Sequence, residues 1–427
     1  MDQGAKMNSS RPDAFVFRDL FSWWSGADPR PRRALTAAAL GWMLDAFDVM
    51  LYSMVIANLM VAFKMDKETA GLLGSLTLIA AAVGGMLFGF IADRYGRTKA
   101  MMAAIAIYSV FTAACGLSAS ILQLAIFRFL LGLGMGGEWS SGAALVSESW
   151  PAVHRAKAMG LMQSFYAVGY ALAALTVAVV LPACGWRPVF FVGILPAFLI
   201  IWIRSRVQEP DIWIEKKLQV KTSLPEMLRV IFGRRLRSLT IVVTLMNAFT
   251  MFAWWGFNLW IPAYLILSPQ KGGMGLTRSG QTWLIVVMQF GMWLGYLTFG
   301  FISDRFGRKL VYIVFLTGAA LLLFLYSLVH VPAVLFFLGP LVSFFGTGHF
   351  SGFGALTAEI YPTQVRATAQ GFTYNIGRIM SAVAPFAVGS LAQTRGFGAA
   401  FAVAALSFFL AALMWLWIPE TAGRKLE

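Results

Sequence analysis

The chain contains one charged segment twice, at a separation of 211 residues. The segment Asp93 to Arg97 reads DRYGR, and the segment Asp304 to Arg308 reads DRFGR. Four more residues have copies at the same separation: Glu148, Pro151, Arg155 and Glu209, copied as Glu359, Pro362, Arg366 and Glu420. Independent loops would not keep a constant register over so long a stretch. The sequence therefore predicts two copies of one structural plan.

Composition indicates that both copies lie in a membrane. Of 427 residues, 59% are hydrophobic and 12% are charged, and the charged fraction is about half that of a soluble domain. Segments of about 20 apolar residues can cross a roughly 30 Å hydrocarbon layer as helices. Six lie in the first half, at 34–61, 69–92, 99–118, 120–147, 156–181 and 187–204, and six in the second, at 238–266, 279–303, 309–329, 332–358, 367–392 and 397–418. Lipid offers no hydrogen-bond partners to the backbone, so we expect an all-α protein of twelve transmembrane helices in two pseudo-symmetric six-helix bundles.

The basic residues indicate which side each loop faces. If both termini are cytoplasmic, 26 of the 34 Lys and Arg residues fall in cytoplasmic segments, as the positive-inside rule requires. We therefore expect a multi-pass protein of the cell (inner) membrane, without a cleavable signal peptide. The net charge of +15 then reflects topology and anionic lipid, and does not indicate a nucleic-acid partner.

Five parts follow along the chain. Residues 1–33 form a cytoplasmic segment with an interfacial helix at 11–25, 34–204 the first bundle, 205–236 a cytoplasmic linker with a pair of surface helices, 237–418 the second bundle, and 419–427 a cytoplasmic tail. Cys115 and Cys184 both fall near outer helix ends, so a disulfide is conceivable, although cysteine is ordinarily a small buried hydrophobic residue.

Five charged residues fall inside the apolar segments: Asp45, Asp48, Arg128, Glu138 and Arg378. A charge within the membrane costs several kcal/mol unless it is paired or lines a wet cavity. These residues therefore predict a polar site, although ion pairs with a purely structural role are an alternative. The five residues comprise three carboxylates and two guanidiniums, so they carry one surplus negative charge when all are ionised. Because arginine keeps its proton, a carboxylate is the natural proton carrier.

The motifs resemble those of a known family. The segments Gly89 to Lys99 and Gly300 to Lys309 are similar to the two copies of the loop signature of the major facilitator superfamily. Arg128 followed by Gly132, Gly134 and Gly136 is similar to its helix-four motif, and Pro419 to Arg424 resembles the cytoplasmic end of its sugar-porter branch. Leu44 to Asp48 and Gly136 to Trp139 resemble the proton-coupled organic-acid carriers, particularly the sialate and lactate symporter group.

The resemblance implies a major facilitator fold and proton-coupled symport of a small organic anion, a monocarboxylate such as lactate or pyruvate or another organic acid. It also implies a proton switch, because Asp48 aligns with a helix-one aspartate that faces the helix-four arginine, here Arg128, in sugar porters. Asp45 is the second candidate. Glu138 is a further proton-coupling candidate. It corresponds at the 211 separation to His349, which is predicted to contribute to the substrate site and is equally well explained as a hydrogen-bonded core histidine.

Arg378 is the predicted substrate ligand, because no acidic residue of the second half lies at similar depth and a carboxylate fits a guanidinium in a bidentate manner. Other polar or aromatic residues at helical spacing complete the predicted pocket: Tyr374, Asn375 and Ser381, then Gln163, Tyr166 and Tyr170, then Asn247, Trp254 and Asn258. Each aromatic residue alone is as well explained by core packing.

The repeated charges are predicted to form a cytoplasmic gate: Asp93, Arg97, Glu148 and Arg155, with Asp304, Arg308, Glu359 and Arg366. Arg97 is expected to meet Glu148, and Asp93 to brace the start of a neighbouring helix.

Other functions fit less well. An enzyme would need a nucleophile with its base or a metal cluster, and three His and two Cys residues show no such pattern. We expect no cofactor other than the coupling proton, no metal, and a monomer in the bilayer. A nutrient sensor and a symporter of sugars, polyols or sialic-acid-like compounds remain alternatives. The sugar symporter would tolerate replacement of Arg378.

Overall fold

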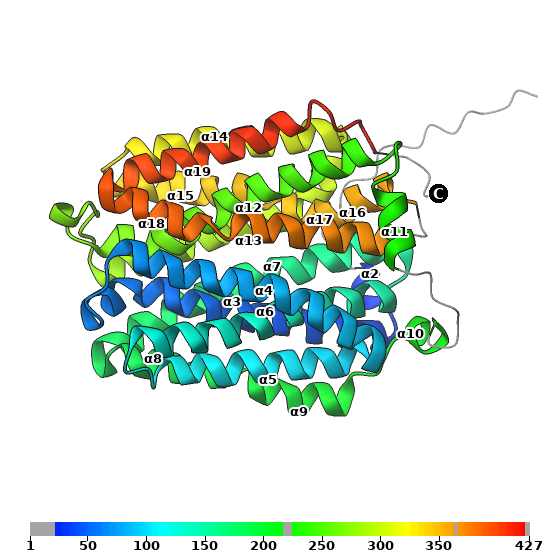
Figure 1. Ribbon diagram of the computed structural model, residues 1–427, viewed down its shortest axis with the longest axis horizontal. Helices are drawn as coiled ribbons and strands as arrows, with labels where there is room; N and C mark the ends of the chain where they lie inside the picture. Colours follow the sequence, from blue (N-terminus) through cyan, green and yellow to red (C-terminus); the bar gives the residue numbers. More distant parts are fainter. Residues whose placement is uncertain (1–21, 217–223, 363–364, 423–427) are drawn as a thin grey trace, which may run out of the picture.

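The computed structural model describes residues 22–216, 224–362 and 365–422. Its long helices run side by side, with the two halves of the chain in adjacent layers (Figure 1). The first half contains α2 (Ser22–Ser25), α3 (Pro29–Ala62), α4 (Lys67–Tyr95), α5 (Arg97–Cys115), α6 (Ile121–Ser149), α7 (Ala152–Cys184), α8 (Trp186–Phe191), η1 (Val192–Ile194) and α9 (Ala197–Arg206). Two short helices follow, α10 (Asp211–Lys216) and α11 (Leu224–Ile231). The second half contains α12 (Arg237–Ile266), η2 (Pro269–Lys271), α13 (Arg278–Phe306), α14 (Arg308–Leu328), α15 (Pro332–Thr347), α16 (His349–Ile360), α17 (Arg366–Ser381), α18 (Ala384–Thr394) and α19 (Gly396–Met414).

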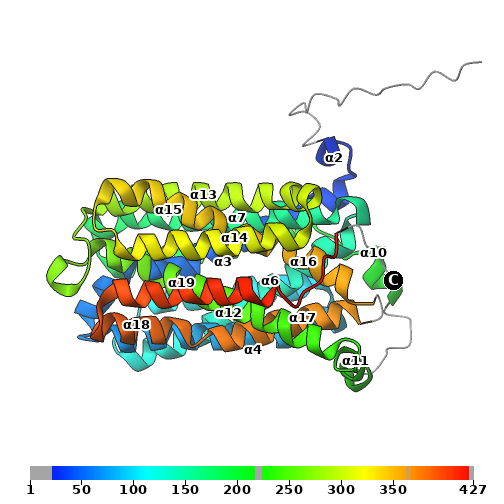
Figure 2. The ribbon, with the colours of Figure 1, turned by 90° about the horizontal axis from the view of Figure 1, so that it is seen from above.

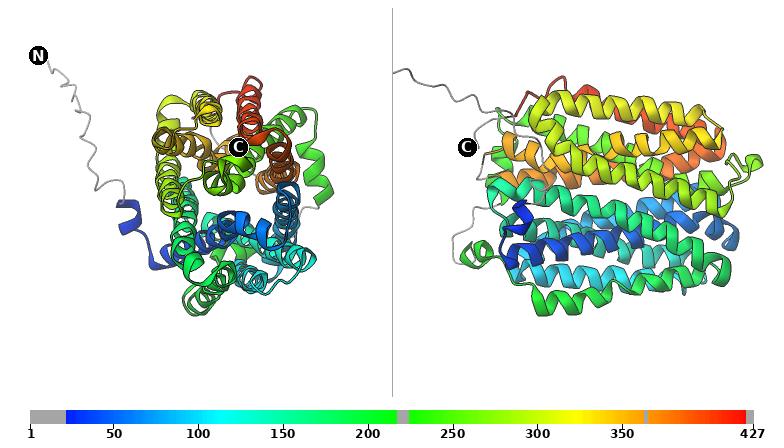
Figure 3. Two further views of the ribbon diagram at one scale, coloured as in Figure 1. Left: turned by 90° about the vertical axis from the view of Figure 1, so that its left-hand side faces the viewer. Right: turned by 180° about the vertical axis from the view of Figure 1, so that it is seen from behind.

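The two ends of the bundle differ in what they carry. Helices α2, α10 and α11 lie at one end, which we call the terminal end, and α8 and η2 lie at the other, the far end (Figures 1 and 2). Seen along the helices, the two halves form two groups that meet across a shared interface (Figure 3). Helices α3, α4 and α7 of the first half contact α12, α18 and α13 of the second. A site between the halves is therefore bounded by these helices.

The start of several helices follows from local chemistry that is itself repeated. The Asp66 side chain accepts a hydrogen bond from Thr69 N (2.8 Å) at the start of α4. Thr277, 211 residues later, caps α13 in the same way through Gly280 N (3.1 Å). The hydrogen bonds that the Asp66 carboxylate accepts from Thr69 lower the pKa of Asp66, because they favour its ionised form. These caps support the duplication read from the loops.

Glycine also occupies matching positions in the two repeated loops. Gly96 joins α4 to α5 with φ 122°, and Gly307 joins α13 to α14 with φ 92°. Residues with a Cβ rarely adopt such positive φ values, so glycine permits the short turn in both copies. The turn places the arginine that follows at the first position of the next helix.

Eleven helical stretches of the described residues are long and apolar enough to cross a membrane. The remaining predicted segment, 367–392, is interrupted, because α17 ends at Ser381 and α18 begins at Ala384. Pro385 lies in the first turn of α18, and a proline there cannot donate a backbone hydrogen bond to the preceding turn. The segment at 332–358 is likewise divided, between α15 and α16 at Gly348. The fold is the all-α architecture expected, with breaks that the apolar pattern did not predict.

The remaining expectations concern the segments between the bundles. Most of the interfacial helix predicted at 11–25 lies outside the described residues, which include only α2 of it. The linker 205–236 carries α10 and α11, and residues 217–223 lie outside the described part. Cys115 is buried, Cys184 is exposed, and both are free thiols. The conceivable disulfide is therefore not formed.

Candidate functional site

All five charged residues singled out within apolar segments are buried. Asp45, Asp48, Arg128, Glu138 and Arg378 each expose 2% or less of their surface. They lie on three helices, α3, α6 and α17, and α3 and α17 each contact a helix of the other half. Burial of so many charges is costly unless they act on one another or on a ligand.

Arg378 lies in the last turn of α17. Its Nη2 donates to the Tyr374 hydroxyl at 3.5 Å. Its Nε and Nη1 have no hydrogen-bond partner among the described residues. A buried guanidinium with two free donor positions can bind a carboxylate through two parallel hydrogen bonds.

Two stacked aromatic rings flank the guanidinium. Trp139 of α6 and Tyr374 of α17 stack with ring centroids 4.0 Å apart and an interplanar angle of 5°. The Arg378 Cζ atom lies 6.0 Å from the Trp139 ring and 5.2 Å from the Tyr374 ring. Because Trp139 belongs to the first half and Tyr374 to the second, the stack joins the halves beside the free donors. The predicted pocket contained Tyr374, but Trp139 entered the sequence argument only as part of a motif.

Asp45 supplies the electrostatic counterpart of Arg378 from the other half. The two groups attract each other, but no ion pair within 4.0 Å joins them in the described structure. Asp45 is also repelled by Glu138, and its Oδ2 atom has no hydrogen-bond partner among the described residues. Asp45 therefore interacts electrostatically with both a buried guanidinium and a second buried carboxylate.

Glu138 of α6 points toward α3. Its Oε1 lies where a methyl group on Gly41 of α3 would stand, and 3.4 Å from the position of a methyl group on Gly142. Both of its oxygen atoms are buried without a hydrogen-bond partner in the described part of the chain. His349, its counterpart in the other half, is 3% exposed, and its ring lies 4.5 Å from that of Phe350. His349 is therefore held in an aromatic environment at the start of α16.

The ion pair expected between Asp48 and Arg128 is not formed among the described residues. Arg128 instead lies over the Tyr52 ring, with Cζ 3.6 Å from its centroid, and its Nε donates to the Leu73 carbonyl at 3.4 Å. The Asp48 carboxylate faces η1, because Oδ1 lies 3.0 Å from the position that a methyl group on Gly193 would take. Depth along the helix was a correct guide to burial, but not to which neighbour each side chain faces.

Two of the predicted aromatic residues form part of a row of rings between the halves. Trp254 of α12 and Tyr166 of α7 lie with ring centroids 6.5 Å apart. Trp42, which the sequence argument missed, extends the same row, with its ring 5.1 Å from Tyr166. The Tyr166 hydroxyl and the Gln163 Oε1 atom are buried without a hydrogen-bond partner among the described residues. In the sequence an aromatic residue of a helix looks the same in a packed core and in a pocket, so Trp42 gave no separate signal.

Other predicted residues hold helices in place. Asn247 Nδ2 donates to the carbonyls of Thr373 (3.3 Å) and Tyr374 (3.4 Å), so it supports the backbone of α17. Asn375 Nδ2 donates to Gly371 O in its own helix (3.0 Å). The Ser381 hydroxyl donates to the Arg378 carbonyl (2.9 Å). These bonds fix the segment that carries Arg378.

Hydrogen bonds close the interface between the halves at the far end. Tyr170 OH and Ser53 Oγ donate to the Asn258 carbonyl at 3.2 and 3.0 Å. Lys67 Nζ, from the first half, donates to the carbonyls of Lys271 (3.0 Å) and Ala392 (3.1 Å) in the second. Tyr170 and Asn258, which were predicted to bind substrate, therefore contribute to this closure.

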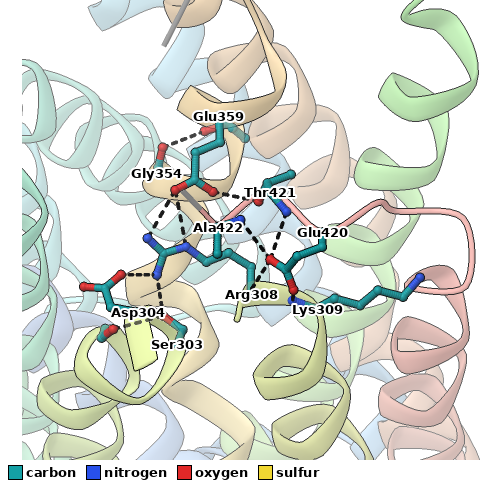
Figure 4. A network of polar contacts seen from close by, with 11 residues as sticks. Ser303, Asp304, Arg308, Lys309, Gly354, Glu359, Glu420, Thr421 and Ala422 are labelled. Carbon is teal, nitrogen blue, oxygen red and sulfur yellow. Dashed lines mark hydrogen bonds and ion pairs between the residues drawn. The ribbon is translucent and has the colours of Figure 1, made fainter. Parts of the chain in front are cut away.

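The repeated charges at the terminal end form one cluster within each half. Arg97 binds Asp93 (2.5 Å) and Glu148 (3.0 Å). In the copy, Arg308 binds Asp304 (2.6 Å) and Glu359 (3.2 Å), and Thr421 Oγ1 donates to Glu359 (2.6 Å) (Figure 4). The predicted contact of Arg97 with Glu148 is confirmed. In this conformation each cluster stays in its own half.

The role expected for Asp93 belongs to a different residue. Asp93 pairs with Arg97, whereas Glu209 accepts from the backbone N–H groups of Arg97 (2.7 Å) and Thr98 (3.1 Å) at the start of α5. Glu420 does the same for Arg308 (2.9 Å) and Lys309 (3.0 Å) at the start of α14 (Figure 4). Partial burial acts to raise the pKa of Glu420, but four backbone N–H donors outweigh it and lower the pKa.

The two remaining residues of the predicted gate are Arg155 and Arg366. Arg155 of α7 is partly buried, and its Nε has no hydrogen-bond partner among the described residues. Arg366 begins α17, and its Nε donates to the Tyr361 carbonyl at 3.3 Å. Neither is among the ion pairs that join Arg97 and Arg308 to their carboxylates.

Comparison with known proteins gives a consistent result along the whole chain. The family model of the Major Facilitator Superfamily matches residues 38–271 and 265–427. The cis,cis-muconate transport protein of Acinetobacter baylyi is 30% identical over 382 residues, which are 88% of this chain and 91% of that protein. The sialic acid transporter NanX of Escherichia coli is 30% identical over 390 residues, 91% of this chain and 94% of that protein. A crystal structure of a D-xylose-proton symporter shares the fold with a TM-score of 0.74 at 19% identity, covering 92% of this chain and 99% of that one.

Proposed function

The chain belongs to the major facilitator superfamily, and we propose that it carries a small organic anion across the membrane together with protons. As a member of this family it is a multi-pass membrane transporter and not an enzyme. The transported anion and the coupling ion are our proposal, and they depend on the buried charges between the two halves.

The observation that carries the proposal is the Arg378 guanidinium, which is 1% exposed and has two donor atoms without partners among the described residues. A ligand carboxylate would provide the missing acceptors and neutralise the charge. The two relatives support this assignment, because cis,cis-muconate and sialic acid are both carboxylic acids. The stacked rings of Trp139 and Tyr374 suit a substrate whose remaining part is apolar or planar.

Asp45 is the proposed site of proton coupling. When ionised, it attracts Arg378 and competes with the substrate carboxylate for the guanidinium. When protonated, it loses this attraction, and Arg378 is free to bind the anion. Proton binding at Asp45 and anion binding at Arg378 therefore favour each other. Asp48 and Glu138 are the alternative proton sites, since both are buried carboxylates without hydrogen-bond partners among the described residues.

The closure of one end supports transport by alternating access. The halves are hydrogen-bonded to each other at the far end, while the charge clusters at the terminal end each stay within one half. If the terminal end is cytoplasmic, as the basic residues predict, the far end is the outer gate and is closed. We propose a monomer in the inner membrane with both termini in the cytoplasm.

Reconstituted vesicles test the function. Purified protein is first screened by thermal shift against mono- and dicarboxylates and against D-xylose, because a ligand of the folded state raises the melting temperature. Vesicles containing the protein should then accumulate the stabilising acid when the outside is acidified. Stabilisation by sugars alone would favour the sugar symporter, and binding without accumulation would favour the sensor.

The role of Arg378 has its own test. Arg378→Lys should weaken binding of the acid about tenfold or more, because an ammonium cannot make the two parallel hydrogen bonds of a guanidinium. Arg395→Lys is the matched control, since Arg395 is exposed beyond α18. Equal affinities of the parent and Arg378→Lys by calorimetry would remove Arg378 from the binding site.

A further inference from the structure

A groove on the outside of the first half is separate from the central site. It lies between α5 and α9 and has a volume of about 520 Å³. Helix α9 lies on the outer side of the bundle against α5 (Figure 1). The groove therefore opens toward the surrounding bilayer and not toward the transport path.

The groove has a charged end and an apolar body. Lys99, in the first turn of α5, and Arg204, in the last turn of α9, line it at the terminal end, and both are exposed. Met102, Ala106 and Ile200 line the rest. From Lys99 to Ala106 the helix rises about 10 Å, so the apolar part extends from the headgroup level into the hydrocarbon.

Two further groups define the chemistry at the charged end. Thr98 is 5% exposed and lines the groove, and its hydroxyl has no hydrogen-bond partner among the described residues. Glu209 also lines the groove, but its carboxylate accepts from the backbone N–H groups of Arg97 and Thr98. Its negative charge is thus directed to the start of α5, which leaves two cations and a free hydroxyl for an anionic ligand.

The internal duplication shows that these residues are not a general feature of the fold. At the 211 separation, Lys99 corresponds to Leu310 and Arg204 to Trp415. Trp415 is fully buried and stacks on Tyr312 with ring centroids 4.4 Å apart. Basic residues at helix ends often extend to the membrane surface without binding anything specific, but neither Lys99 nor Arg204 has a basic copy at the 211 separation.

We propose that the groove between α5 and α9 binds one anionic phospholipid of the leaflet at the terminal end. Its phosphate lies between Lys99 and Arg204, with the Thr98 hydroxyl as a further donor. One acyl chain follows Met102, Ala106 and Ile200. A soluble phosphate would use only the charged end, whereas a phospholipid uses both the cations and the apolar body, so the shape of the groove favours the lipid.

Native mass spectrometry of the purified full-length protein with added phosphatidylglycerol or phosphatidylcholine tests the proposal. We expect one phosphatidylglycerol to bind in preference to phosphatidylcholine. The variant Lys99→Gln/Arg204→Gln should weaken phosphatidylglycerol binding about thirtyfold, since each basic residue near an anionic lipid contributes about fivefold. The matched control, Arg305→Gln/Lys309→Gln, removes two positive charges from the same end of the other half and should change the affinity less than about threefold. Equal losses in both variants would show a general charge effect and overturn the proposal.

A second variant separates the lipid from a soluble anion. Ala103 is exposed and lines the groove, so Ala103→Trp should fill the apolar part without disturbing the core. We expect it to weaken phosphatidylglycerol binding about fivefold or more, because it displaces acyl-chain contacts. Glycerol phosphate should not compete. Retained lipid binding in Ala103→Trp, or displacement by glycerol phosphate, would show that the groove does not hold an acyl chain.

Discussion

Lys67 should control the opening of the far end. It is the first residue of α4, and its ammonium group crosses to the second half, where it donates to Lys271 O and Ala392 O at 3.0 and 3.1 Å. It also lies 4.7 Å from the Phe397 ring centroid. Ala392 is in the last turn of α18, where carbonyls lack helical partners and the helix dipole favours a cation. Replacing Lys67 by methionine removes these interactions and keeps most of the apolar side chain.

The expected effect follows from these contacts. A hydrogen bond to a charged group contributes about 1.5–3 kcal/mol, and an ammonium over an aromatic ring about 0.5–1 kcal/mol. The cost of removing the ammonium from water offsets part of this gain, because Lys67 is only 8% exposed. We take a net preference of about 2 kcal/mol for the closed far end, which is about thirtyfold in the ratio of closed to open molecules.

Spin-label distances across the far end measure that ratio. One label is placed on the native Cys184, which is exposed, and the second on Gln270→Cys, while buried Cys115 stays unlabelled. Lys67→Met should move a large part of the distance distribution to longer values. Lys64→Met, an exposed lysine in the same loop, is the control and should leave the distribution unchanged. An unchanged distribution in Lys67→Met, or the same change in both variants, would refute the role of these contacts.

Further variants address the proton site and the terminal end. Asp45→Asn should keep exchange of labelled substrate across vesicle membranes but abolish its accumulation against a gradient. Asp48→Asn should keep part of that accumulation. Loss of accumulation in Asp48→Asn, with accumulation kept in Asp45→Asn, would assign the proton to Asp48. Glu148→Gln should lower the melting temperature more than Asp93→Asn, because the side chain of Glu148 is 14% exposed and that of Asp93 is 61% exposed, and exposed ion pairs contribute little. Glu420→Gln should cost about 1 kcal/mol of stability at neutral pH, through a weaker cap on α14. Since the pKa of Glu420 is lowered in the folded state, this difference should be present above the usual glutamate pKa of about 4.3 and disappear as pH falls through the lowered value; a difference that stays constant at acidic pH would contradict the capping role.

Much of the architecture could be predicted because it depends on repetition and length. The 211-residue register identified Arg97 and Arg308 as equivalent residues, and the structure places both at the first position of a helix. Burial of the five intramembrane charges could also be predicted, since an apolar segment of about 20 residues leaves its middle inside the bilayer. These inferences need only the position of a residue along its helix.

The features that escaped prediction depend on direction around the helix and on contacts between distant segments. Asp48 has the depth to meet Arg128, but it faces η1, and Arg128 lies over Tyr52. Glu209 was recognised as a repeated residue, but its role at the start of α5 requires knowing that α9 returns beside that helix. Neither fact is contained in the periodicity of a single segment.

The two halves share their terminal charge clusters but not their buried charges, and this difference bears on the proposed coupling. Arg97 and Arg308 make equivalent clusters, whereas the residues at the 211 separation from Asp45 and Arg378 are Gly256 and Ala167. The carboxylate therefore belongs to the first half and the guanidinium to the second. Any motion of one half relative to the other changes the distance between them, and with it the attraction between the guanidinium and an ionised Asp45. The proposed coupling requires that the proton affinity of Asp45 differ in this way between the two access states, because only then can a proton gradient drive the movement of an anion bound at Arg378.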